Sequence, residues 1–126
     1  MMSQQTPVLD YPAFIPSDLQ IEFCVEDCLD CMRACEHAAV KCLRGLPLTW
    51  MVVYHKTLLD CADLAQHTAQ ALARQETGAL ELVDLCAESC GVMARECGAF
   101  DDECFRVCAE ACLRCAESCR EVLEAA

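Results

Sequence analysis

The chain has 126 residues and a formal charge of −12, which fits a single domain with an excess of acidic side chains. This charge argues against nucleic acid as a partner, because phosphate binding requires clustered Lys and Arg and the sequence contains no such cluster. Cysteine supplies 14 residues while Gly and Pro supply four each, a composition that favours helices over sheets.

The first residues contain prolines but no targeting signal. The start, MMSQQTPVLDYPAFIPSDL, lacks both a basic n-region and an apolar h-region, so no secretory signal is predicted. No apolar run approaches the length of a membrane span. We therefore expect a cytoplasmic protein without a membrane partner, in which residues 1–16 form an extended arm and residues 17–126 form a helical domain.

A first helix is predicted from Ser17 to about Leu43. Ser17 and Gln20 have the spacing of a capping box, and Gly45 followed by Pro47 ends the helical pattern. Its cysteines are separated by four, three, four and seven residues, which predicts a stripe of thiols on the core face. They are Cys24, Cys28, Cys31, Cys35 and Cys42. A second apolar stripe, expected to hold the helices together, contains Val25, Leu29, Met32, Val40 and Leu43.

A second helix is predicted from about Trp50 to Arg74, with Thr49 as its N-cap. Its core-facing stripe repeats the four-three spacing but carries one thiol, that of Cys61. The other members of this stripe are Tyr54, Leu58, Ala65, Thr68 and Leu72.

A turn around Gly78 separates the second helix from a third, which is predicted from about Ala79 to Cys97 and is ended by Gly98. Cysteines occupy three positions of its stripe, and Met93 fills the position between the last two. These cysteines are Cys86, Cys90 and Cys97.

A fourth helix is predicted to start at an Asp101 N-cap and to reach about Leu123. Short connections between consecutive helices favour an all-α fold, an antiparallel up-down-up-down four-helix bundle with a cysteine-lined core. The fourth helix contributes Cys104, Cys108, Cys112, Cys115 and Cys119.

The spacing of the thiols favours metal binding over disulfides. Thiols at i and i+4 start from Cβ atoms about 5–6 Å apart, which is too far for a disulfide, and a reducing cytosol keeps thiols free. Small thiols also fill a core less well than Leu, which argues against a purely structural role. Cu(I) fits best among soft metals, because one monovalent ion bridging two thiolates lets a long stripe fill while remaining close to neutral.

Zinc or an iron–sulfur cluster is the alternative, because either requires four thiolates gathered from several helices. Helix heights predict such a set at one end of the bundle: Cys42, Cys97, Cys104 and Cys108. The same heights predict a middle layer of Cys31, Cys35, Cys61, Cys86, Cys90, Cys112 and Cys115. Cys24, Cys28 and Cys119 are expected toward the other end.

Few other side chains are candidates for the site. Met93 lies on the stripe, where it serves either as a thioether ligand or as a core filler. His37, His55 and His67 fall beside the stripe, which predicts surface or rim positions. Catalysis requires a positioned base beside a nucleophile, and no such pair shares the stripe, so an enzyme is not predicted.

The motifs CLDCMRAC, LLDCAD, CAESC and CAEACLRCAESCR closely resemble the copper storage protein family, in particular its cytosolic branch. The likeness covers about residues 20–121. It implies a four-helix bundle that holds many Cu(I) ions on interior thiols, assembles as a tetramer and exchanges copper with a chaperone or small thiol.

Four positions depart from the family pattern, which leads us to expect cysteine at Ala38, Tyr54, Ala65 and Met93. Cys104 precedes its expected position by one residue. The family often has histidines at the turn between the third and fourth helices, where this chain has GAFDDE. We therefore expect a lower copper capacity than in fuller members and a different uptake route.

Overall fold

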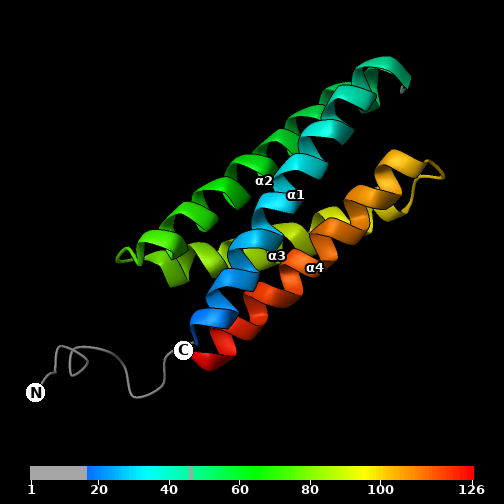
Figure 1. Cartoon of the computed structure of the whole chain (residues 1–126). Helices are drawn as coiled ribbons and strands as arrows, with labels where there is room; N and C mark the ends of the chain where they lie inside the picture. The colour runs from blue at the N-terminus through cyan, green and yellow to red at the C-terminus, as the bar shows by residue number, and fades with distance from the viewer. Residues whose placement is uncertain (1–16, 46) are drawn as a thin grey trace, which may run out of the picture.

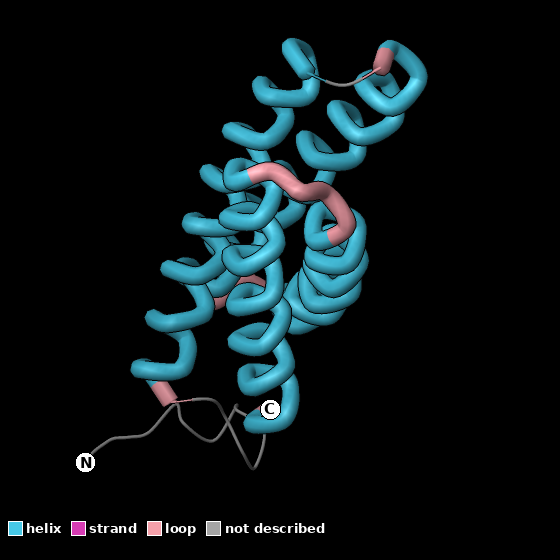
Figure 2. Tube along the Cα trace, turned by 90° about the vertical axis from the view of Figure 1, so that its right-hand side faces the viewer, coloured by secondary structure: helices cyan, strands magenta, loops and turns pink. Residues whose placement is uncertain are grey.

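The computed structural model describes residues 17–45 and 47–126, which form four helices and no strand (Figures 1 and 2). The predicted arm, residues 1–16, lies outside the described residues. The helices are α1 (Asp18–Gly45), α2 (Leu48–Arg74), α3 (Ala79–Gly98) and α4 (Glu103–Ala125).

The four helices pack as a closed ring. Each helix contacts the helix that follows it in the chain, and α1 also contacts α4. In the described residues, no Cα atoms of α1 and α3, or of α2 and α4, lie within 8 Å of each other, so these diagonal pairs meet only through side chains in the interior. The predicted antiparallel four-helix bundle is therefore confirmed, with an interior bounded by all four helices.

The start of α1 matches its predicted cap. The Ser17 amide donates to the Gln20 Oε1 atom at 2.9 Å, and the Gln20 amide donates to the Ser17 hydroxyl at 3.1 Å. This reciprocal pair is a capping box, which satisfies two amides that the first helical turn leaves without a partner.

The predicted caps of α2 and α4 are wrong by one or two residues. Pro47 holds the N-cap position of α2 without a side-chain cap, because a proline side chain has no hydrogen-bond acceptor. Its carbonyl accepts the Met51 amide at 2.9 Å, so Thr49 lies inside the helix. Asp102 rather than Asp101 caps α4. Its carboxylate accepts the amide of Cys104 at 2.8 Å, and its extended backbone is the conformation that an N-cap requires.

The core consists mainly of Cys and Ala side chains, which lie on the inward faces of all four helices. In the second stripe of α1, Val25, Leu29 and Met32 pack against this core as predicted. Val40 and Leu43 do not, since they are 49% and 54% exposed. Cys42, which lies between them in the sequence, is fully buried, so Val40 and Leu43 lie on sides of α1 that face away from the core. The helices α1 and α2 have 28 and 27 residues, against 20 and 23 in α3 and α4.

The longer hairpin of α1 and α2 extends past the turn between α3 and α4, as both views show (Figures 1 and 2). Within residues 17–45 and 47–126, no helix is both long enough and apolar enough to cross a membrane.

Candidate metal centre

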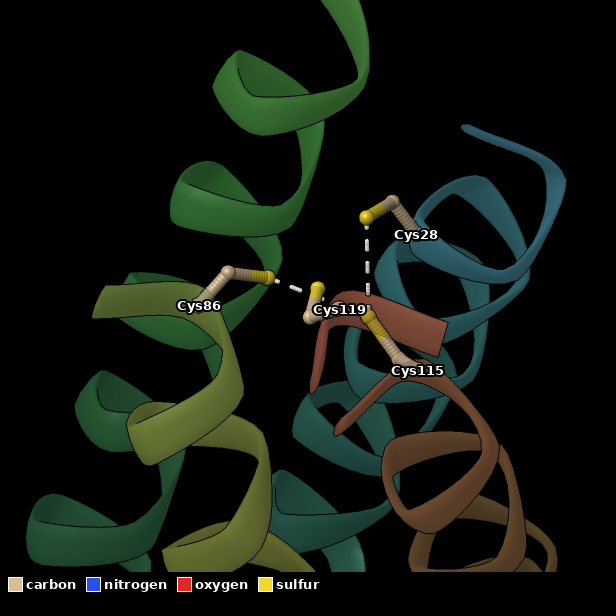
Figure 3. A group of neighbouring side chains, drawn as sticks. All are labelled: Cys28, Cys86, Cys115 and Cys119. Atoms are coloured by element: carbon tan, nitrogen blue, oxygen red, sulfur yellow. Dashed lines mark hydrogen bonds between the residues drawn. The ribbon is translucent and has the colours of Figure 1, made fainter. Parts of the chain in front are cut away.

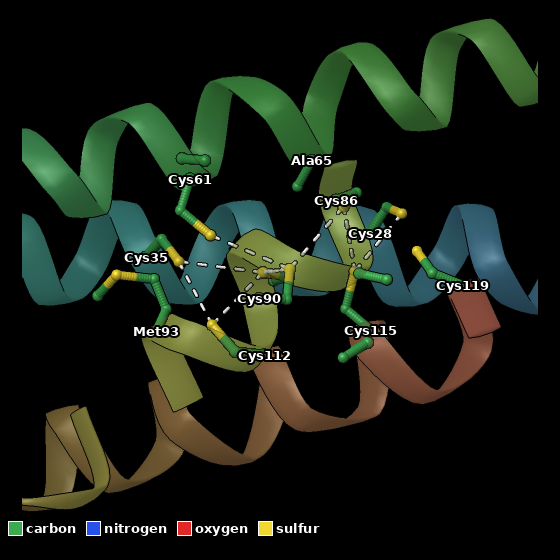
Figure 4. Close-up of a cluster of buried hydrophobic side chains, with 14 of the residues drawn as sticks. Cys28, Cys35, Cys61, Ala65, Cys86, Cys90, Met93, Cys112, Cys115 and Cys119 are labelled. Atoms are coloured by element: carbon green, nitrogen blue, oxygen red, sulfur yellow. Dashed lines mark hydrogen bonds between the residues drawn. The ribbon is translucent and has the colours of Figure 1, made fainter. Parts of the chain in front are cut away.

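All fourteen cysteines are unpaired thiols, and thirteen of them are buried. Spacings of three and four residues place them on one face of each helix, and packing turns each of these faces inward. Figure 4 shows the sulfur atoms of the cysteines that it labels, such as Cys35, Cys61 and Cys112, directed into the space between the helices. Because α1, α3 and α4 each supply several thiols and α2 supplies one, the interior is lined by sulfur over most of its length.

Eight of these thiols form a continuous series of close sulfur contacts, here called the sulfur column. Its Sγ–Sγ separations lie between 3.5 and 3.8 Å. In order along the bundle, its members are Cys108, Cys35, Cys112, Cys31, Cys90, Cys86, Cys115 and Cys28. Cys61 joins the column through Cys90 at 4.0 Å, and Cys24 lies 3.7 Å from Cys119.

The thiols form three groups, and within each group all sulfur atoms lie within 4.8 Å of one another, close enough to share a metal ion. Each group draws on at least three helices, because no straight helix can fold four thiols around one ion. The first group is shown in Figure 3. The groups are Cys28, Cys86, Cys115 and Cys119; Cys31, Cys35, Cys61 and Cys112; and Cys31, Cys90 and Cys115.

The middle layer predicted from helix heights is brought together, since all seven of its thiols belong to these groups or to the sulfur column. The four-thiol set predicted at one end is not among the groups of the described residues. Cys108 instead contacts Cys35 at 3.7 Å and belongs to the column. Cys42 and Cys97 are buried near it, whereas Cys104 is only partly buried.

Phe105 explains the position of Cys104. The four-three spacing that ends at Cys108 places residue 105 on the core face, and Phe105 is buried there with 2% of its surface exposed. Its ring stacks on Phe100 with centroids 4.7 Å apart, and Phe100 also contacts Trp50 and Tyr54 edge-on. These four aromatic rings cover the end of the bundle at the α3–α4 turn, a cluster that our sequence reading missed although the spacing of Phe105 indicated it.

Contacts between sulfur atoms divide the thiols into two kinds. A hydrogen bond from Cys119 lowers the pKa of Cys24 to about 5, and one from Cys112 lowers the pKa of Cys61 to about 5. The hydrogen bond to Cys108 and burial raise the pKa of Cys112. Burial, followed by the neighbouring Cys104 and Cys108, raises the pKa of Cys42. The sulfur contacts therefore favour the ionisation of some thiols and oppose that of others, and no buried Lys, Arg or His lies beside them among the described residues.

The other predicted candidates lie where their spacing placed them. Met93 is 1% exposed and belongs to the core (Figure 4). His37 and His67 are exposed, and the Nδ1 atom of His55 donates to the Ala39 carbonyl at 3.0 Å. The three histidines therefore stand outside the cysteine stripe.

A helical bundle lined by unpaired, clustered thiols defines a class of soft-metal-binding proteins. The family model described as "Csp: Copper storage protein" matches residues 17–124. The chain belongs to this copper storage protein family.

Solved structures and one curated protein support this assignment. The Cu(I)-bound copper storage protein BsCsp3 is 34% identical, with a TM-score of 0.77 over 85% of this chain and 99% of that chain. A cytosolic copper storage protein from Streptomyces lividans, described with five coppers, is also 34% identical, with a TM-score of 0.77 over 84% and 93%. The cysteine-rich protein YhjQ of Bacillus subtilis is 35% identical over 69 residues, which span 55% of this chain and 64% of that protein.

Proposed function

We propose that this protein stores Cu(I), binding several ions per chain on the thiolates that line its core. The observation that carries the proposal is the sulfur column, because a series of contacting thiols offers many adjacent positions for a bridging ion. The proposed ligands are Cys24, Cys28, Cys31, Cys35, Cys42, Cys61, Cys86, Cys90, Cys97, Cys104, Cys108, Cys112, Cys115 and Cys119, with Met93 as a thioether ligand.

Charge favours a monovalent ion over a divalent one. A buried thiolate without a compensating cation costs several kcal/mol, and Zn²⁺ held by four thiolates leaves two negative charges in the core. One Cu(I) per thiolate leaves none. The distances are compatible, because two metal–sulfur bonds of about 2.3 Å span at most about 4.6 Å, and neighbouring sulfur atoms of the column lie 3.5 to 3.8 Å apart.

A zinc site or an iron–sulfur cluster remains the alternative, because two groups contain four thiols each. Either would use one group and leave most of the sulfur column without a ligand role. The number of ions bound per chain therefore separates the proposals.

The first test is an anaerobic titration of the fully reduced protein with Cu(I) against a competing chelator, followed by elemental analysis. Storage predicts about ten or more tightly bound ions per chain, near one per thiol as bridging thiolates allow. One or two ions would overturn the storage proposal and favour a discrete site, and visible absorption after anaerobic purification would identify a cluster.

Four substitutions test whether the middle of the core holds this copper. Changing Cys31, Cys35, Cys112 and Cys115 to Ser should remove much of the capacity while the circular dichroism of the helices is retained. Ala38→Ser with Ala65→Ser is the matched control, because it adds buried hydroxyls to the same stripe without removing sulfur. Undiminished capacity in the fourfold variant would disprove this assignment.

The surroundings of the stripe favour storage over catalysis. Thr68 is the one buried polar side chain of the described residues, and its hydroxyl donates to the Leu64 carbonyl at 2.8 Å, so it is not free to act as a base. The Streptomyces protein is described as cytosolic, which supports a cytoplasmic location for this chain. A copper chaperone or a small thiol is the proposed exchange partner.

We also propose a homo-oligomer, tetrameric by the family resemblance. Large apolar side chains, including Trp50, Val52 and Val53, are more than half exposed on the surface of α2 and provide area for such contacts. Sedimentation velocity of the reduced protein tests this proposal.

A further inference from the structure

A cavity of about 670 Å³ lies in the groove between α1 and the first turns of α4. Arg33, His37 and Lys41 of α1 line one wall, and Cys104 and Val107 of α4 line the other. Its volume is that of a site for a small molecule. The cavity is thus lined by the Cys104 thiol on one side and the His37 imidazole on the other, and both kinds of side chain bind soft metals.

Cys104 is the one cysteine of the fourteen that is not buried. Its side chain lines the cavity and also packs against the core cluster, so it lies between the solvent-exposed cavity and the buried thiols. Cys108 follows one helical turn later on the same side of α4. Because Cys108 lies 3.7 Å from Cys35, the sulfur column begins one turn away from the cavity.

No other approach to the column exposes a thiol, because the remaining thirteen cysteines are buried. The aromatic rings of Phe100 and Phe105 cover the bundle at the α3–α4 turn. At the opposite end, Cys24 and Cys119 have no exposed surface. Two further cavities, one over Met93 and one beside Ile21, are not lined by cysteine.

Resting on the storage function proposed above, we propose that Cys104 is the uptake site, where Cu(I) passes from a small thiol carrier in this cavity to the sulfur column. The Cys104 sulfur binds copper and loses its proton, and the carrier's departing thiolate takes up that proton. Cys108 then displaces Cys104 in the same way, returning a proton to it. Copper remains Cu(I) throughout, so no oxidant or reductant is required. His37 assists as a second ligand during the transfer.

The kinetics of loading test this assignment. Cu(I) presented as its glutathione complex is mixed anaerobically with the reduced protein, and thiolate-to-copper absorbance is followed by stopped flow. Cys104→Ser should slow loading by at least about tenfold, because thiol exchange depends on access to the attacking sulfur, while the final capacity falls by about one ion at most. His37→Ala should slow loading to a smaller extent.

Cys119→Ser is the matched control, since it also removes one α4 thiol, but from the buried opposite end. It should lose the same capacity. The control for the loading rate is Ser89→Ala, which changes the cavity over Met93 that no cysteine lines, and it should load at the wild-type rate. Loading of Cys104→Ser at the wild-type rate would overturn the uptake assignment while leaving storage intact. A low final capacity in the wild-type protein would instead overturn the storage function.

Alkylation tests the site without any substitution. Limited iodoacetamide should modify Cys104 of the folded, reduced protein before the thirteen buried thiols, as mass spectrometry of peptides would report. The singly modified protein should load copper slowly. Modification that reaches Cys24 or Cys42 first, or fast loading after Cys104 is blocked, would overturn the proposal.

Discussion

Ala38 and Ala65 hold two positions of the cysteine stripe where a thiol is missing, and neither has exposed surface. Figure 4 shows Ala65 directed into the same interior as the neighbouring thiols. At both positions the backbone already aims a Cβ atom at the core. The absence of a thiol there is therefore set by the residue type, not by the fold.

Ala65→Cys should accordingly raise the Cu(I) capacity by about one ion per chain, because a bridging ion needs only one more thiolate beside those present. The added sulfur should also cost the apoprotein about 1 kcal/mol of unfolding free energy through overpacking. Ala73→Cys on the exposed side of α2 is the control, and it should leave the tight capacity unchanged. Equal gains from both variants would show that position in the core does not decide binding.

The start of α4 shows how an element's end positions a functional residue. Asp102 accepts the Cys104 and Phe105 amides at 2.8 and 3.4 Å, and its carboxylate lies 3.7 Å from the Lys41 Nζ atom of α1. These contacts fix the first turn of α4 against α1. They therefore hold Cys104 in the cavity wall and Phe105 in the core.

Asp102→Ala should lower the free energy of unfolding by about 1 kcal/mol, the usual cost of losing a capping carboxylate. Asp101→Ala, one residue earlier and exposed, should change it by no more than about 0.5 kcal/mol. Urea denaturation of the reduced apoprotein, followed by circular dichroism, measures both. A larger loss for Asp101→Ala would contradict the cap seen in the structure.

At the scale of the whole molecule, an acidic surface encloses a core of small, ionisable side chains. The chain carries a formal charge of −12 before any thiol ionises, so every additional thiolate adds to an existing negative charge. Copper binding supplies the cations that the described core lacks. It also displaces protons, because most thiols of the core have a raised pKa, including Cys42, Cys97 and Cys112.

The apparent affinity for Cu(I) should therefore fall as the pH is lowered from 8 to 6. Thiols with a raised pKa are protonated across this range, so each one that binds releases a proton and weakens binding by up to about tenfold per pH unit. The lowered pKa of Cys24 and of Cys61, to about 5 in each case, makes copper binding by these two thiols less sensitive to pH over this range. Chelator competition at several pH values measures the slope, and an affinity independent of pH would contradict these pKa shifts.

The periodicity of the sequence was sufficient to predict the helices and to predict that the thiols face the core. Spacings of three and four residues predict which side chains share a face, and burial confirms this for Cys31, Cys61, Cys90 and Cys112. The capping box of Ser17 and Gln20 could also be predicted from the sequence, because both residues lie within one helical turn. Adjacent candidates such as Asp101 and Asp102 were not separable, because either can cap a helix until the backbone selects one.

By itself, the sequence determined that thiols would line the interior of a four-helix bundle, because a helix's periodicity is a local property of the chain. Only the tertiary structure decided which thiols meet, since this depends on how far each helix is shifted along its neighbours. The tertiary structure placed Cys108 against Cys35 instead of in a four-thiol end site, and it left Val40 and Leu43 exposed. It also turned Cys104 toward a cavity, because Phe105 occupies the core position beside it.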